Sequence, residues 1–176
     1  MDETADPDPV ERNPRSIPVL LHSAYLDGPF RSCSVCGEDL CLGRVPYQVQ
    51  KVWRHGEVVF ELAICARCAG MLLKEFSRES IARMQTFQQE HYRPVESVEV
   101  CHFCAKVLTR DAEYEMGAAC AGSILLRPVV VVCGECNARV QENLSRKTRE
   151  AWGDFVAQNF PGVPDALEPE TTPLML

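Results

Sequence analysis

The stretch Cys33-Ser-Val-Cys36 and three related stretches decide the fold of this chain. Each consists of two cysteines separated by two residues, and the other three are Cys65-Ala-Arg-Cys68, Cys101-His-Phe-Cys104 and Cys133-Gly-Glu-Cys136. Residues 37–64 separate the first pair from the second, and residues 105–132 separate the third from the fourth, so both gaps are 28 residues long. The four pairs contain eight of the ten cysteines, which points first to metal chemistry.

The equal gaps belong to an internal repeat. Shifting the sequence by 68 residues superposes the first two cysteine pairs on the last two, and it also superposes Ser77 on Ser145 and Phe87 on Phe155. These identities extend beyond the cysteines, so we infer that one unit was duplicated. The predicted division is a disordered acidic arm (1–16), a first zinc module (17–93), a second zinc module (94–160) and a disordered acidic tail (161–176).

The first module is predicted to contain a hairpin followed by two helices. A half-buried strand is indicated by Tyr47, Val49, Lys51 and Trp53, which alternate with Gln48 and Gln50, and 54–57 have the composition of a hairpin turn. The apolar run 58–64 is the return strand. From Cys68 onward the apolar period becomes helical, and Ser77 is the predicted N-cap of a second helix.

The second module follows the same order. Its first strand is expected around Tyr114, and the small residues of 117–123 indicate a loop. The apolar run 124–132 is the predicted return strand, and Pro128 places it at a sheet edge or a bulge. Ser145 is the predicted cap of the second helix.

Two cysteine pairs brought together form the tetrahedral four-sulfur shell that Zn²⁺ prefers, with bonds of about 2.3 Å. A module of about 60 residues is marginally stable alone, and a structural zinc can supply about 10–16 kcal/mol coupled to folding. We therefore predict two structural zinc ions, one in each module, since the equal gaps argue against crossed pairing between modules. The predicted ligands are Cys33, Cys36, Cys65 and Cys68 for one ion, and Cys101, Cys104, Cys133 and Cys136 for the other.

A cysteine knuckle, a hairpin and a helix whose first turn carries the last two cysteines resemble the treble-clef class of Cys₄ zinc fingers. The resemblance covers about residues 31–93 and 94–160. It implies an α+β fold class of small zinc-stabilised domains, with two tandem modules that each contain knuckle, β-hairpin, helix and second helix. Treble clefs serve in nucleic-acid binding, in protein recognition and, with added elements, in catalysis, so the class does not fix a function.

Other interpretations of the cysteines remain open. Iron is the alternative metal because rubredoxin-like sites also use four thiolates, although the neighbouring residues lack the glycines and proline expected there. A thioredoxin-type dithiol needs one pair on a βαβ scaffold, not four in register. Cys41 and Cys120 do not superpose under the shift, and we expect buried free thiols there, with a thiol redox switch as the alternative. His102 lies inside the third pair, where we expect an exposed side chain.

The net charge of −7 disfavours binding of a polyanion through a broad basic face. We predict a non-enzymatic interaction or adaptor scaffold with a protein partner, whose second helices pack the modules together or form a homo-oligomer. No Ser-His-Asp order, phosphate loop or carboxylate pair predicts an enzyme. The alternative is a nucleic-acid-associated zinc protein, of regulatory, ribosomal or transcriptional kind, that makes contact through module 1. Its predicted contact residues are Lys51, Trp53, Arg54 and His55, with Lys74, Arg78 and Arg83 in addition.

A cytoplasmic location is expected from the sequence. No run approaches the 18 or so apolar residues that span a bilayer, and the acidic, proline-rich start lacks the regions of a signal peptide. In a reducing cytosol paired cysteines are more often metal ligands than disulfides. The apolar segment 17–30 is too short to span a membrane, and we expect it to pack on the first module as a strand or tether.

Overall fold

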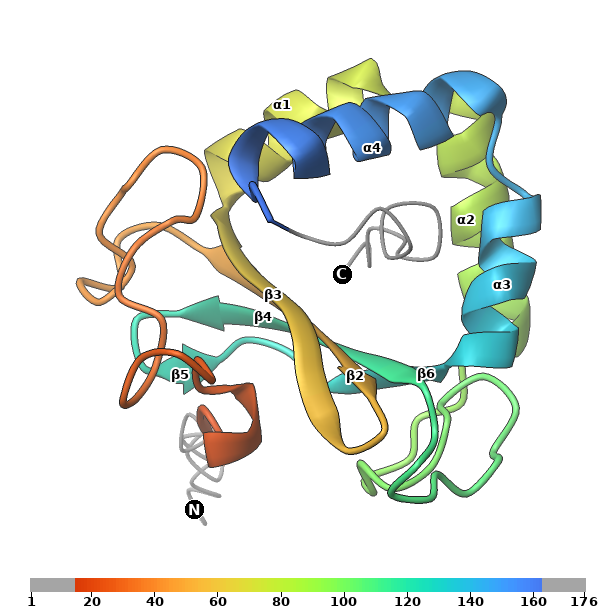
Figure 1. Ribbon diagram of the computed structural model, residues 1–176, viewed down its shortest axis with the longest axis horizontal. Coiled ribbons are helices and arrows are strands. Elements are labelled where there is room, and N and C mark those ends of the chain that lie inside the picture. Colours follow the sequence, from red (N-terminus) through yellow and green to blue (C-terminus); the bar gives the residue numbers. More distant parts are fainter. Residues whose placement is uncertain (1–14, 163–176) are drawn as a thin grey trace, which may run out of the picture.

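The computed structural model describes residues 15–162, which form a mixed structure of helices and strands built on one six-stranded antiparallel sheet (Figure 1). The strands are β1 (Arg15–Ser16), β2 (Tyr47–Arg54), β3 (Glu57–Cys65), β4 (Tyr114–Ala121), β5 (Ile124–Leu125) and β6 (Val130–Cys133). The helices are the 3₁₀ turn η1 (Val19–Leu21), α1 (Ala66–Glu75), α2 (Arg78–His91), α3 (Gly134–Glu142) and α4 (Arg146–Asn159). The predicted arm and tail lie outside the described residues, apart from residues 15–16 and 161–162.

The hairpin of the first module has the predicted turn. His55 and Gly56 join β2 to β3 with φ angles of 52° and 79°, which is the two-residue turn whose twist matches paired strands. The register runs from Arg54 opposite Glu57 to Tyr47 opposite Cys65, with a bulge after Val52. Strand β3 therefore ends on a predicted ligand and leads directly into α1, as the sequence predicts.

The second module departs from the prediction in two places. Residues 117–121, predicted as loop, are part of strand β4, which lies between β2 and the pair β5 and β6. Neighbours on both edges satisfy its backbone groups, so small side chains do not prevent a strand there. The predicted return strand is divided into β5 and β6, and Pro128 lies in the break because it has no amide hydrogen to donate.

Strands β2 and β4 join the two modules into one sheet around a local twofold relation. Tyr47 pairs with Cys65 in the first hairpin and Tyr114 pairs with Cys133 in the second, so Tyr47 and Tyr114, 67 positions apart, are structural equivalents. Gln50 and Gly117 are also 67 positions apart, and they pair with each other between β2 and β4. Equivalent residues face each other at a symmetry axis, so the relation between the modules is centred on this pair.

The second helix of each module packs on the other module. Phe87 of α2 is buried with the cysteines of the second module, namely Cys101, Cys133 and Cys136. Trp152 and Val156 of α4 belong to the core that contains Cys33, Cys65 and Cys68. Figure 1 shows α4 beside α1 and α3 beside α2. The prediction that these helices pack the repeats together is confirmed.

The N-caps of α2 and α4 meet at a cluster of hydroxyl groups. As predicted for caps, the side chain of Ser77 accepts a hydrogen bond from the backbone amide of Ser80, and that of Ser145 accepts one from the amide of Thr148. The caps also contact each other, with 2.9 Å between the Oγ atoms of Ser77 and Ser145. Each cap residue donates its own backbone amide across the axis: that of Ser77 to Thr148 Oγ1 and that of Ser145 to Ser80 Oγ, at 2.9 and 2.8 Å. The cluster thus marks the same local twofold relation as the sheet.

The segment 17–30 packs on the face of the sheet opposite the helices. Lys51 of β2 donates to the backbone carbonyl of His22 and forms an ion pair of 3.5 Å with Glu61 of β3. Glu61 in turn accepts from the hydroxyl of Ser23 and from the backbone amide of Ala24. The sequence prediction of a tether on the first module is therefore confirmed.

Candidate metal centres

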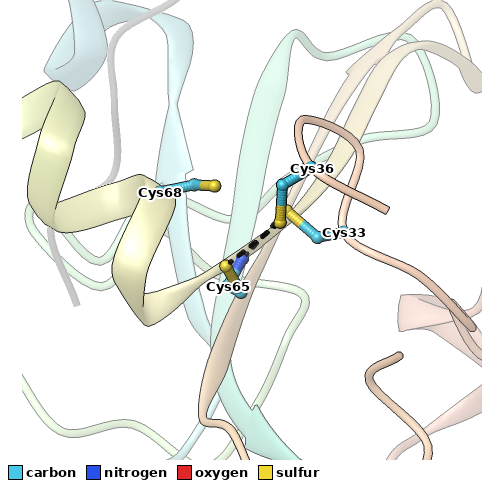
Figure 2. A group of neighbouring side chains, drawn as sticks. All are labelled: Cys33, Cys36, Cys65 and Cys68. Carbon is cyan, nitrogen blue, oxygen red and sulfur yellow. Dashed lines mark hydrogen bonds between the residues drawn. The ribbon is translucent and has the colours of Figure 1, made fainter. Parts of the chain in front are cut away.

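The four cysteines of the first module converge at the junction of a loop, a strand and a helix. Cys33 and Cys36 lie on the loop before β2, Cys65 ends β3 and Cys68 lies in the first turn of α1 (Figure 2). All four Sγ atoms lie within 4.8 Å of one another, and the Cys36 and Cys65 sulfurs are 3.8 Å apart. A tetrahedral shell with bonds of about 2.3 Å has sulfur–sulfur edges of about 3.8 Å. The sulfurs therefore fit a zinc-sized ion.

The second module repeats this geometry. The Sγ atoms of Cys101, Cys104, Cys133 and Cys136 also lie within 4.8 Å of one another. The distance from the Cys104 sulfur to the Cys133 sulfur is 3.7 Å. In both groups three cysteines are buried and the second knuckle cysteine is exposed. The structure brings together all eight residues that the sequence singles out, in the pairing predicted within each module, and both groups could hold a metal ion.

Backbone geometry aims an amide group at the sulfur of the first cysteine of each site. The amide of Cys65 donates to Cys33 Sγ at 3.4 Å, and the amide of Cys133 donates to Cys101 Sγ at 3.3 Å. These bonds stabilise a thiolate. The knuckle turns close through a left-handed residue, which is Gly37 in one module and Ala105 in the other, with φ angles of 74° and 61°.

An ion pair lies beside each site. The position that is acidic in the first module is basic in the second, and the reverse holds for its partner position. In the first module Arg67 lies 3.9 Å from Glu38 and also donates to Cys36 Sγ at 3.6 Å. In the second module Lys106 lies 2.6 Å from Glu135. Positions 38 and 106 are equivalent under the 68-residue shift, and so are positions 67 and 135. Sequence reasoning missed this exchange, although the shift that revealed the repeat also superposes these residues.

The environment shifts the thiol pKa values in opposite directions within one site. The backbone amide of Glu38 and then the guanidinium of Arg67 lower the pKa of Cys36 to about 6. Burial raises the pKa of Cys68, and burial likewise raises the pKa of Cys133 to about 11. Without a cation the thiols of Cys68 and Cys133 therefore keep their protons, whereas a bound metal would replace those protons. Such a donor set suits a thiophilic divalent ion.

Geometry alone establishes two closed groups of four sulfurs. Comparison of the chain with models of protein families, with curated proteins and with solved structures found no match. No helix among residues 15–162 is long and apolar enough to cross a bilayer. Function must therefore be argued from the sites and surfaces themselves.

The remaining cysteines and His102 lie outside both groups. Cys120 is buried, as expected, and burial raises its pKa to about 11. Cys41 is exposed, so the expectation of a buried thiol is wrong there, because its backbone amide bonds to Asp39 in a surface loop. The sequence predicts an exposed His102, but this residue is buried, with 1% of its surface exposed. Its ring packs against Tyr92 and its Nε2 donates to the Ser97 carbonyl, so it is part of the interior.

Not all of the basic and aromatic residues predicted for nucleic-acid contact lie on the surface. Lys51 and Trp53 are buried, and the Trp53 ring stacks on Tyr114 at 5.2 Å. Arg54 lies 3.6 Å from Glu113, and Arg83 pairs with Glu79. Lys51 and Trp53 therefore contribute to the sheet and to its contact with segment 17–30, whereas the Arg83–Glu79 pair lies within helix α2.

Proposed function

We propose that the protein is a non-enzymatic zinc-binding scaffold, with two structural Cys₄ sites of the treble-clef type, that works by contact with a protein partner. The observation that carries this proposal is the pair of closed sulfur groups, each with edges of tetrahedral length. Zinc is favoured over iron because the spacing and surroundings of the cysteines are those of structural zinc modules. Bound zinc would link each knuckle to the end of a hairpin and the start of a helix.

Four protein sulfurs around one ion favour a structural role over a catalytic one. A catalytic zinc usually has three protein ligands and keeps a position open for water or substrate. Here each shell is complete with side chains of the chain itself. The backbone amides that point at Cys33 and Cys101 add fixed positive ends around the thiolates. Such a site would stabilise the fold and would not act on a substrate.

A groove beside the first site supplies a surface for a partner. It has a volume of about 870 Å³ and runs between the first knuckle, α1 and α4. Met71 lies in it with 62% of its surface exposed, next to Val35 and Phe155. Charged side chains of both signs, including Lys147 and Asp154, also line it. Apolar and charged residues occur together in protein interfaces, and such a groove suits a helix with one apolar side.

Elemental analysis of the natively purified chain tests the metal. We expect two zinc ions per chain and no iron, together with loss of the folded signal when a strong chelator removes them. Circular dichroism and metal content, measured on the same sample, report both results. A chain that keeps its fold without metal would refute the structural role.

Affinity capture from native extract with two matched variants tests the partner surface. Met71→Asp places a charge in the groove, while Val107→Asp places the same charge on an exposed apolar residue of the second module. We expect the same captured proteins with the wild type and Val107→Asp, and their loss with Met71→Asp. Equal capture by all three would exclude the groove. A salt-dependent gel shift of the full chain with nucleic acid would favour the alternative function.

A further inference from the structure

A cavity of about 300 Å³ lies between the sheet and the helices. Its apolar lining comes from β3, from α1 and the residue after it, and from α4. The larger apolar residues of the lining include Leu62, Ile64, Leu72, Phe76, Trp152 and Phe155. The volume is at the lower end of the range for ligand sites, about 300–1,000 Å³, so the cavity can receive a few apolar side chains.

The polar groups of the cavity suit an anionic peptide. Gln85 and Gln88 project from α2, and each amide can donate to and accept from a peptide backbone. Arg127, from the connection between β5 and β6, is also part of the lining. It is exposed, and no carboxylate among residues 15–162 forms an ion pair with it. The cavity therefore has apolar walls and a positively charged side chain, that of Arg127, which can pair with a negative group of a ligand.

The described chain ends beside this cavity. Helix α4 finishes at Asn159, and the amide of Phe160 still donates to the Val156 carbonyl. The Phe160 ring packs edge-on against Phe155, at 6.0 Å between centroids, and Phe155 is part of the cavity wall. Residues 163–176 follow directly. Fourteen residues can span up to about 46 Å when extended, so every part of the cavity is within their reach.

The sequence of this segment matches the lining. Residues 163–176 contain Asp165, Glu168 and Glu170 and no basic residue, and they include the apolar run Pro173-Leu-Met-Leu176. The apolar run fits the walls, and the negative charges complement Arg127. Covalent attachment through a short linker gives an effective concentration in the millimolar range. The segment therefore has an advantage over any free ligand of comparable intrinsic affinity.

We propose that residues 163–176 bind in this cavity, with the apolar run 173–176 against Trp152 and Phe155 and a carboxylate near Arg127. The cavity is then an intramolecular peptide site. Another chain with a similar acidic and apolar segment would have to displace residues 163–176 in order to bind there.

Methyl NMR of the full zinc-loaded chain with labelled methionines tests the proposal. The Met175 signal is identified by its loss in Met175→Leu, and the exposed Met71 serves as the internal reference. We expect the Met175 methyl to be shifted by the aromatic rings and to show a nuclear Overhauser effect to the Trp152 indole. A Met175 signal at the position of a free peptide, without that effect, would overturn the proposal.

Two matched variants and one mixing experiment exclude other occupants. Leu174→Asp is expected to move the Met175 signal to the free-peptide position, while Thr171→Asp, with the same added charge, is expected to leave it in place. Arg127→Glu is expected to increase the free population. If the contact with Trp152 appears only between differently labelled copies, the occupant is a second chain. If a co-purified small molecule fills the cavity while Met175 is free, the occupant is a ligand. Either result contradicts the proposal.

Discussion

Gly37 and Ala105 occupy the same place in the two knuckles, and both have a left-handed backbone. Such a conformation costs a residue with a Cβ atom about 1–2 kcal/mol, whereas glycine adopts it freely. We expect Ala105→Gly to stabilise the protein by about 1 kcal/mol and Gly37→Ala to destabilise it by about as much. No atom lies within 4 Å of a Cβ built at Gly37, so this cost is conformational. Denaturant midpoints at a fixed free zinc concentration measure both changes, and effects of equal sign would contradict the prediction.

The exchanged ion pairs make the two metal sites unequal. Arg67 places a cation next to Cys36, where it would offset the negative charge of the proposed zinc tetrathiolate, while Glu135 occupies the equivalent position in the second site. Exposed charge interactions contribute about 0.2–1 kcal/mol, which corresponds to a few-fold change in rate. We expect Arg67→Glu to speed the transfer of one zinc ion to a coloured chelator by about two- to five-fold. Glu135→Arg should slow the other.

Stopped-flow mixing with the chelator resolves these two phases. Arg78→Glu makes the same charge change on an exposed residue of α2 and should alter neither phase. The charge effect should diminish at high salt, because exposed interactions are screened. If Arg67→Glu and Arg78→Glu gave equal rates, the neighbouring charge would have no influence on metal release.

Ser80 and Thr148 connect the second helices at the scale of elements. Both are buried, and each accepts the backbone amide of the cap residue from the other module. Removal of either hydroxyl leaves a buried amide without its partner, which costs about 1–3 kcal/mol. We expect this loss in Ser80→Ala and in Thr148→Val. The double variant should lose less than the sum, because the hydroxyls belong to one network.

Chemical denaturation measures these losses. Thr86→Ala removes a hydroxyl from the exposed side of α2 and should change the free energy of unfolding by less than about 0.5 kcal/mol. Additive effects of Ser80→Ala and Thr148→Val would show that the caps act independently of each other.

Elements encoded locally were predictable, while those created by contact between modules were not. The turn at His55-Gly56 and the caps at Ser77 and Ser145 follow from the residues themselves, and the structure confirms them. The cysteine spacing also anticipated which sulfurs converge. The strand at 117–121 did not follow from its small residues, because its partners lie in β2, about 70 positions earlier in the chain. Burial of Trp53 and His102 likewise depends on neighbours that periodicity does not reveal.

At the scale of the whole molecule, the two modules share a sheet and exchange their second helices. Neither module completes its core with its own residues: α2 covers the sulfurs of the second site, and α4 packs on the core of the first. Loss of one metal ion should therefore disturb the helix that stabilises the other half. This coupling distinguishes the structure from two independent zinc domains joined by a linker.

Cys136→Ser tests this coupling. Cys136 is buried in the first turn of α3 and contributes one of the second group of sulfurs, so its loss should release one zinc ion. Because Phe87 packs in the same cluster, we expect α2 to loosen and the remaining zinc to transfer faster to a chelator. When a chelator removes zinc from the wild type, tryptophan fluorescence and zinc release should follow one common transition. The reason is that Trp152 of the second module lies in the core of the first. Cys41→Ser, outside both groups, should keep two ions. An unchanged release rate at the first site in Cys136→Ser would mean that the modules are energetically independent despite their shared sheet.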